Sequence, residues 1–512
     1  MCSTSHLNYD VIEEICEFIV LGGGGARRGL RDMALVSRAF CELALNILWR
    51  DLRGIRPLVK LLFVSEKPHP CPREIRYLYP FGMFPCLVLD KPISAAQWER
   101  VQFYAPRVRT VIYGAEYPPI DPSIIYAIGY YAQPHAIFPR LHKLTLNKGH
   151  VYAGEILCFI SETLEQIFFG AKWRGSHHWP SRETSSIGYD LFPRQEEFNM
   201  HQFLPAIYSR APQMRHISLK WPLMKIPLEG LALFRDLQKL SLNDVFCRKS
   251  EDLSGLASLP HLEELSIELP RIPHPLPSSN SGFGALKHLV VWGRRHSGWH
   301  ALRSFLAAIT STQLSCILIH YAFHRDASYE PCGCEPPLSH LLQRRSPSMH
   351  RLTFQIYFGK GTADIPDFMR SIGPFLQWSE LRVVSICLTR KDGISIMTLP
   401  GDMLFTLAES WPNLELLSIA LGQSADGQVT LELSINGVVR FILRCPNLRR
   451  LRLPSAIVRA EDLWADIPRD KQHALESLKI GYICREDKDD ALLKRIRVFL
   501  RNIFPFVANN YM

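Results

Sequence analysis

The chain has 512 residues, of which 47% are hydrophobic and 21% charged. This balance excludes a disordered chain and supplies enough apolar residues for a large core. Lys and Arg number 59 against 49 Asp and Glu; a solvated surface explains this mild excess better than nucleic-acid binding. The thirteen cysteines are too sparse for a disulfide scaffold. The sequence shows no secretory signal, lipidation motif or apolar run of about 18 residues, so we expect a reduced, soluble protein of the cytoplasm or nucleus, without a membrane partner.

Residues 1–52 show helical apolar spacing in three runs, which predicts a small three-helix bundle. The first run covers residues 7–19, with Asn8 or Asp10 as its cap and with Ile12, Ile15 and Ile19 on one face. Four glycines at 22–25 follow, without the lysine and Ser/Thr of a phosphate-binding loop, and are interpreted as a flexible linker. The second and third runs cover residues 30–40 and 41–50.

The bundle resembles the F-box, a motif that docks onto the Skp-type adaptor of cullin–RING ubiquitin ligases. The resemblance is carried by residues 7–15, 35–40 and 48–50, although Asn8 stands where the family usually has proline. It implies a set of adaptor-contacting side chains: Leu7, Ile12, Ile15, Leu35, Val36 and Phe40. The alternative is a private helical core packed on the first repeat. Trp49 is expected in the core in either case.

Residues 53–82 are interpreted as a linker or N-terminal cap, after which a single pattern dominates. The pattern is apolar, two residues, apolar, one residue, apolar, and it occurs fourteen times. The triplets span residues 84–89, 108–113, 141–146, 164–169, 214–219, 237–242, 262–267, 286–291, 314–319, 349–354, 381–386, 414–419, 448–453 and 475–480. This is the strand signature of leucine-rich repeats, in which the three apolar side chains point inward.

Helical segments and prolines separate the triplets. Prolines at 212, 260, 412 and 446 each stand two residues before a triplet, where they end a helix. Most triplets start 23 to 35 residues apart, and the longer intervals leave room for a full helix. One interval of 50 contains a predicted inserted loop at about 171–199. The expected fold over residues 83–512 is an α/β leucine-rich-repeat solenoid: a curved parallel sheet on the concave face, helices outside, and a C-terminal helical cap.

The sequence offers no constellation that carries catalysis. Cys332-Gly333-Cys334 lacks a second metal-binding pair, and His177-His178 lies in a polar insertion. No nucleophile elbow, zinc-protease helix or dinucleotide fingerprint is present. We therefore expect neither an enzyme nor a cofactor or metal site.

The outward residues of the predicted strands form the candidate recognition surface. Arg449, Arg450 and Arg452 make its densest basic cluster, which fits an acidic or phosphorylated segment of a protein client. A merely solvated surface is the alternative. Trp179, Trp292 and Trp299 would be anchors if they are exposed.

The layout of the whole chain resembles fungal F-box proteins with leucine-rich repeats. This resemblance implies a substrate-recognition subunit of a Skp–cullin–F-box ubiquitin ligase, which binds the Skp-type adaptor and cullin complex through the bundle and a protein client through the repeats. The alternative is a non-degradative binding scaffold whose bundle only caps the solenoid.

Overall fold

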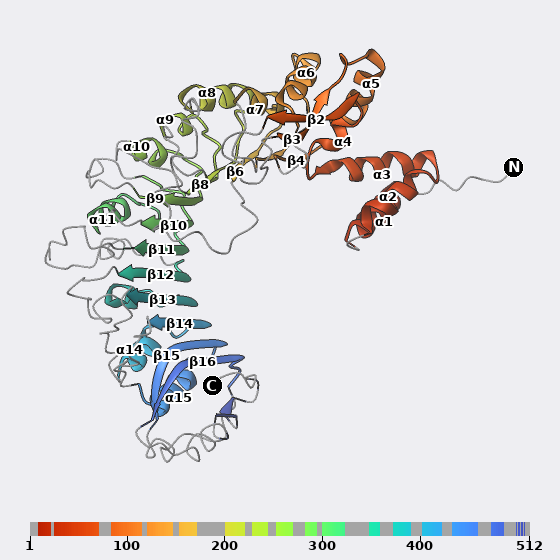
Figure 1. Cartoon of the computed structure of the whole chain (residues 1–512). Helices are drawn as coiled ribbons and strands as arrows, with labels where there is room; N and C mark the ends of the chain where they lie inside the picture. Colours follow the sequence, from red (N-terminus) through yellow and green to blue (C-terminus); the bar gives the residue numbers. More distant parts are fainter. Residues whose placement is uncertain are drawn as a thin grey trace. The chain divides into compact units, whose positions relative to one another are not determined.

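The computed structural model divides into two compact units, Met1–Lys239 and Leu240–Met512. Helices and strands carry the labels of Figure 1. The structure describes residues 9–21, 25–70, 83–114, 120–146, 153–170, 200–220, 228–243, 252–269, 282–293, 299–322, 348–358, 372–390, 402–421, 433–458, 473–485, 498, 500–501, 503–504 and 506.

The first unit begins with three mutually contacting helices: α1 (Tyr9–Leu21), α2 (Ala26–Ala34) and α3 (Arg38–Arg50). The predicted bundle is confirmed, but its second helix ends earlier than expected. Ser37 is the N-cap of α3, where its hydroxyl oxygen accepts a hydrogen bond from the Phe40 amide at 3.4 Å. Because this cap starts a new helix, Leu35 and Val36 lie in the turn between α2 and α3 and not within a helix.

A small antiparallel pair follows the bundle, and it corrects the predicted start of the repeats. After α4 (Arg56–Val59), strand β2 (Val64–Pro70) pairs with β3 (Met83–Leu89), so the first triplet, 84–89, lies outside the long sheet. Pro68 and Pro85 face each other in this pair. Proline has no amide proton to donate, which confines it to such edge positions. The sheet begins instead with β1 (Asp51–Leu52), inside the segment assigned to the bundle.

The long sheet has 14 strands in the order β1-β4-β5-β6-β7-β8-β9-β10-β11-β12-β13-β14-β15-β16. The first unit contributes β4 (Thr110–Tyr113), β5 (Lys143–Leu146), β6 (Gln166–Gly170) and β7 (His216–Lys220). Next come β8 (Lys239–Asn243), β9 (Glu264–Glu268), β10 (His288–Gly293), β11 (Cys316–Ala322) and β12 (Arg351–Phe358). The last are β13 (Val383–Arg390), β14 (Leu416–Leu421), β15 (Arg450–Val458) and β16 (Ser477–Arg485).

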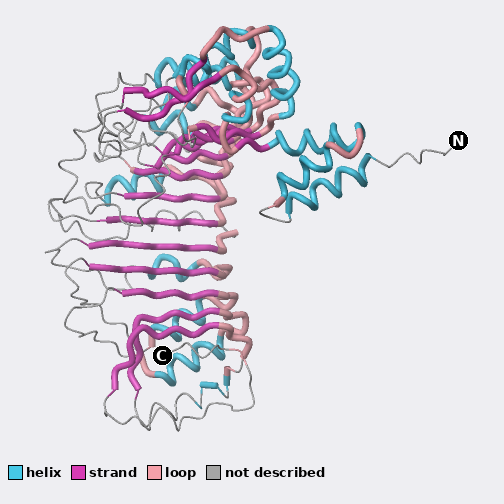
Figure 2. The backbone as a smooth tube through the Cα atoms, turned by 45° about the vertical axis from the view of Figure 1, so that its right-hand side comes forward, coloured by secondary structure: helices cyan, strands magenta, loops and turns pink. Residues whose placement is uncertain are grey.

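Parallel registers keep the triplets in step, as the ladder of strands in the second unit shows in Figure 2. Leu352 on β12 aligns with Val384 on β13, which aligns with Leu417 on β14. All thirteen triplets after the first belong to strands of this sheet, and none of their apolar side chains is more than 7% exposed. The buried triplets form the core, and the molecule is a leucine-rich-repeat solenoid of the predicted α/β class.

Return helices lie between the strands and follow the interval lengths. Long intervals hold α6 (Pro122–Ala132), α14 (Met403–Ser410) and α15 (Ile435–Arg444). Short ones hold α7 (Ala153–Phe159), α9 (Leu228–Leu231) and α10 (Asp252–Ala257). Two further helices are α8 (Met200–Arg210) and α11 (Trp299–Ala307), and η4 (Gly373–Gln377) is a 3-10 turn.

The predicted proline stops are confirmed in the described helices. Helix α8 ends two residues before Pro212, and α14 and α15 end two residues before Pro412 and Pro446. The predicted insertion at 171–199 lies outside the described residues. Of the predicted C-terminal cap only a few residues are described, among them the buried Leu500, Ile503 and Phe504.

Candidate functional site

Helix α1 carries two apolar stripes, of which one is buried and one exposed. Ile12 and Cys16 are 0% exposed and form the bundle core, with Ile19 packed against them. Val11, Ile15 and Phe18 recur with the same spacing on an adjacent face and are 46%, 42% and 76% exposed. The expectation that Ile12 shares an exposed face with Ile15 is therefore wrong, because the stripe that faces α2 and α3 contains Ile12.

The turn between α2 and α3 adds two more exposed apolar side chains. Leu35 is 81% and Val36 70% exposed, whereas Phe40 packs partly against the bundle core. Leu7 lies outside the described residues. We refer to Val11, Ile15, Phe18, Leu35 and Val36 together as the apolar bundle surface.

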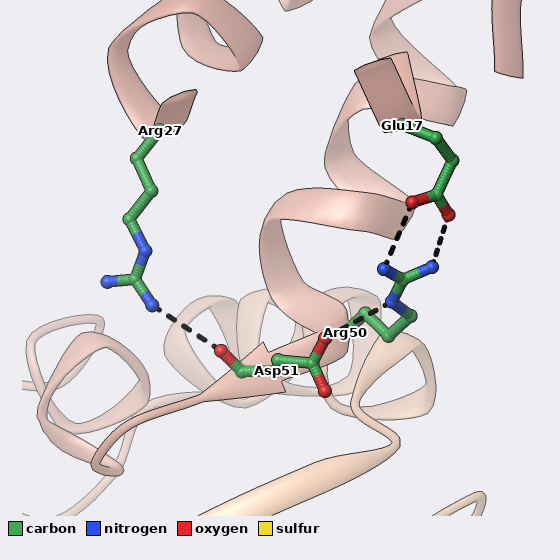
Figure 3. A network of polar contacts seen from close by, with 4 residues as sticks. All are labelled: Glu17, Arg27, Arg50 and Asp51. Carbon is green, nitrogen blue, oxygen red and sulfur yellow. Dashed lines mark hydrogen bonds and ion pairs between the residues drawn. The ribbon is translucent and has the colours of Figure 1, made fainter. Parts of the chain in front are cut away.

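An ionic network joins the bundle to the first strand of the sheet (Figure 3). The Arg50 guanidinium donates two hydrogen bonds to the Glu17 carboxylate, one of them from Nη2 to Oε2 at 3.3 Å. Its Nε also donates to Asp51 Oδ2 at 3.2 Å, and Arg27 Nη2 donates to the Asp51 carbonyl oxygen at 3.4 Å. The bond to Glu17 is the main cause that raises the pKa of Arg50. The network ties the C-terminal ends of α1 and α3 to β1.

A second face of α3 packs against α5 (Ala95–Tyr104) and η2 (Ala105–Arg107), which precede β4. Trp49 stacks on Tyr104 with ring centroids 4.3 Å apart. The Arg107 guanidinium pairs with Glu42 at 2.9 Å and also hydrogen-bonds Asn46 Oδ1. Glu42, Asn46 and Trp49 are spaced four and three residues apart, so they share one side of α3. The bundle therefore caps the sheet with side chains that do not belong to the apolar bundle surface.

Opposite charges alternate on the outward side of the sheet, at the strand starts of the second unit. Lys287 pairs with Glu263 at 2.7 Å, and Arg382 with Glu415 at 3.7 Å. In the predicted basic cluster, Arg449 and Arg450 approach the same carboxylate, that of Glu476. Exposed pairs of this kind contribute about 0.2–1 kcal/mol each, so they leave the arginines available to a partner.

Arg452 differs from its two neighbours. It is exposed, and its register partner on β16 is the exposed Lys479. Within the described parts of the chain, neither Arg452 nor Lys479 has an ion-pair partner. The structure thus brings the three predicted arginines together and adds Lys479 to them.

An aromatic group stands on the same outward side. Trp292 is 39% exposed and stacks on His320, with ring centroids 4.1 Å apart and planes 9° from parallel. His320 Nδ1 hydrogen-bonds Gln355 Oε1 at 2.8 Å, and Tyr357, two residues further on β12, is 44% exposed. Burial lowers the pKa of His320, against the opposing effect of the Gln355 hydrogen bond.

Of this aromatic group, only Trp292 was predicted from the sequence. His320, Gln355 and Tyr357 were missed, although one signal pointed to the first two. Trp292, His320 and Gln355 occupy the same outward position in three successive repeats, and the parallel register aligns them. Trp179 and the side chain of Trp299 lie outside the described residues.

Among the described residues, no group of three or more His, Cys, Asp or Glu side chains is arranged to hold a metal ion. No helix in the same residues is long and apolar enough to cross a membrane. Cys332 and Cys334 lie outside that part of the chain.

The fold and the buried triplets define a leucine-rich-repeat protein. The sequence matches no described protein family and no curated protein. Among solved structures, the chain is similar to a leucine-rich-repeat protein of Leptospira interrogans (12% identity, TM-score 0.38, 82% of this chain and 92% of that chain). It is also similar to the Toll–Spätzle complex of Drosophila (13%, 0.39, 77% and 46%) and to the TLR13–ssRNA13 complex (13%, 0.34, 77% and 57%). It spans about half the length of these last two chains.

Proposed function

We propose that this chain is a substrate-recognition subunit of a Skp–cullin–F-box ubiquitin ligase. The apolar bundle surface docks the Skp-type adaptor, and the outward side of the repeats holds a protein client. Catalysis then belongs to other subunits, and this chain raises the effective concentration of the client near them. The role places the protein in the cytoplasm or nucleus.

The observation that carries the proposal is the exposure of the apolar bundle surface. Its five side chains are between 42% and 81% exposed, and all belong to a bundle of about forty residues. Burying one such side chain fully contributes about 1.5–3 kcal/mol, and contiguous exposed patches mark interaction sites. The spacing of Val11, Ile15 and Phe18 is that of a helix face laid into a partner's groove.

A non-degradative scaffold is the second candidate, because α3 packs against α5 and η2. The stack of Trp49 on Tyr104 and the pairing of Arg107 with Glu42 give the bundle this structural role. Capping alone, however, provides no reason for Leu35 and Val36 to stand 81% and 70% exposed on another part of the bundle. This difference favours the ligase role.

Capture by a purified Skp-type adaptor tests the proposal. We expect the full chain to be captured, and the variants Ile15→Asp and Leu35→Asp to lose capture while they stay folded by circular dichroism. Tyr130→Asp is the matched control, since Tyr130 on α6 is 74% exposed and outside the bundle, and it should bind like the wild type. If the folded wild-type chain is not captured at all, the scaffold role replaces the ligase role.

Point variants are a better test than deletion of residues 1–52. That deletion also removes β1, the first strand of the sheet, and the side chains of α3 that cap α5 and η2. It would therefore change the repeats together with the adaptor site. Ile15→Asp and Leu35→Asp leave the capping side of α3 intact.

A further inference from the structure

We infer that the outward side of strands β10–β16 binds an extended, acidic protein segment that carries an apolar side chain at a set distance from its acidic residues. The inference names the client chemistry of the proposed function and rests on its assignment of the repeats as the client-binding face. Two groups of side chains carry it, an aromatic group on β10–β12 and a basic group on β15–β16.

The aromatic group offers rigid anchors for an apolar side chain. Trp292 is held in place by its stack on His320 and by a hydrogen bond from its Nε1 to Ser266 Oγ at 3.4 Å. His320 is in turn fixed by Gln355. Trp292 and Tyr357 nevertheless remain 39% and 44% exposed. Prearranged, half-exposed Trp and Tyr side chains are typical of binding hot spots, because little side-chain entropy is lost when a partner covers them.

The basic group offers positive charge that its one paired carboxylate compensates only in part. Arg452 and Lys479 are register partners on neighbouring strands, and both are exposed. Glu476 is shared by Arg449 and Arg450 at the strand starts, at distances of 3.3 and 4.0 Å. Four cations thus face one carboxylate in this cluster, and the charge that remains uncompensated lies at Arg452 and Lys479. An anionic partner group supplies the missing compensation.

The strands between the two groups set the spacing. In the middle of these strands the outward residues are small: Ser385 and Cys387 on β13, and Ser418 and Ala420 on β14. Neighbouring strands lie about 4.8 Å apart, and the register places Arg452 level with Thr353 and Val290, so it is roughly 20 Å from the position of Tyr357 and roughly 25 Å from that of Trp292. An extended chain covers about 3.3 Å per residue, which places the apolar and acidic residues roughly six to eight positions apart.

The charge distribution favours a protein segment over a nucleic acid. A single-stranded nucleic acid needs a continuous basic groove and free aromatic faces on which bases stack. Here one face of Trp292 is occupied by His320, and Glu264 and Glu268 lie on the neighbouring strand β9. The basic group is confined to one end of the face. An acidic segment with an apolar residue matches both ends.

Fluorescence anisotropy with the full chain tests the inference. The probes are labelled peptides in which one leucine and an Asp-Asp pair are separated by Gly-Ser spacers of increasing length. We expect the tightest binding at spacers of about five to seven residues. Arg452→Glu should weaken that peptide at least about tenfold. Arg440→Glu is the matched control: it reverses the same charge on the exposed side of α15, away from the strands, and should leave binding unchanged.

A second set of variants tests the aromatic end. Trp292→Ala and Tyr357→Ala should weaken the peptide that contains leucine, and should not affect a peptide in which alanine replaces the leucine. Tyr357→Ala keeps this test decisive if Trp292→Ala unfolds. Equal binding of the leucine and alanine peptides by the wild-type chain would overturn the role of the aromatic group.

Two further probes identify the partner class. A phosphoserine peptide of the same spacing and a labelled single-stranded RNA are measured beside the acidic peptides. Binding of the phosphoserine peptide alone overturns the assignment to carboxylates, and tighter binding of the RNA overturns the assignment to protein. If no peptide binds while the adaptor is captured, this inference fails and the ligase role stands. If peptides bind with the expected spacing while the adaptor is not captured, the ligase role fails and this inference stands.

Discussion

The N-terminal bundle and the repeat sheet place their apolar side chains in opposite ways. In the sheet, the apolar side chains of the triplets are at most 7% exposed. The outward positions include charged, polar and aromatic residues. In the bundle, one stripe of α1 is buried, and a second apolar stripe and the turn after α2 remain exposed. A triplet position therefore indicates core in the repeats, whereas an apolar stripe in the bundle indicates either core or a partner.

The difference follows from how each region closes its core. Each repeat has a neighbour whose strand and helix cover its triplet, so its apolar residues are satisfied within the chain. Three short helices enclose only a small volume and bury little area on their own. The second stripe of α1 stays exposed among the described residues. The bundle thus offers a partner exposed apolar side chains. The repeats offer a polar face that carries the aromatic group and the basic group.

The largest expected effect tests the closed core of the repeats. Trp411 is 0% exposed, and its Nε1 donates a hydrogen bond to the Phe375 carbonyl oxygen at 3.1 Å. We expect Trp411→Ala to lower the free energy of unfolding by about 3–5 kcal/mol, as is usual for removal of a buried tryptophan. Trp411→Phe, which mainly removes the hydrogen bond, should cost about 1–3 kcal/mol. Urea denaturation followed by circular dichroism measures both, and equal losses would contradict this assignment.

A pair of variants on one helix tests the two stripes of α1 directly. Ile12→Ala should destabilise the bundle by about 2–5 kcal/mol, because Ile12 is 0% exposed. Ile15→Ala, at a site that is 42% exposed, should cost less than about 1 kcal/mol. Hydrogen exchange of residues 9–21 in the full chain reports the local opening free energy for each variant. Similar exchange in both would show that the stripes are not buried and exposed as described.

The same pair shows how far the sequence alone predicts the structure. Triplet spacing predicted thirteen of the strands. It did so because the same pattern recurs in every repeat, so that a segment ambiguous by itself is identified by its neighbours. It failed at 84–89, where the pattern is present but the strand pairs antiparallel with β2. It also missed β1, which is only two residues long. The helical spacing of apolar residues correctly predicted α1. It did not separate Ile12 from Ile15, because the two apolar stripes of α1 are offset from each other by one residue.

The candidate surfaces were predicted less well than the fold. Three arginines at the end of the sheet are visible as a charge cluster in one short segment, but Lys479 joins them only through the register of β15 with β16. Trp292, His320 and Gln355 are separated by 28 and 35 residues in sequence. These three residues become neighbours only when the triplets of successive repeats are aligned. Aligning the repeats first and then comparing their outward residues would have identified the aromatic group.

A smaller effect is expected at the ionic network that joins α1 to α3. Glu17 and Arg50 are 40% and 38% exposed, so solvent screens their attraction. We expect Glu17→Gln to cost less than about 1 kcal/mol by the same hydrogen-exchange measurement. Asp32→Asn is a useful control, since its partner Arg31 is 65% exposed and adjacent in sequence. A loss as large as that of Ile12→Ala would mean that charge, not apolar burial, holds the bundle together.

The smallest effect is a pH dependence confined to the repeats. Because burial lowers the pKa of His320 below its ordinary value of 6.5, the folded state binds its proton less readily than the unfolded state does. Neutral His320 therefore contributes its full stability to the folded state above about pH 6.5. This contribution to the free energy of unfolding is lost as the pH falls through the lowered pKa of His320 in the folded state. Urea midpoints should therefore fall more steeply between pH 7.5 and 5.5 in the wild type than in His320→Gln. Residues 9–52 contain no histidine, so exchange from the bundle should show no difference between these two proteins. A difference that appears in the bundle as well would couple the two regions that the burial pattern separates.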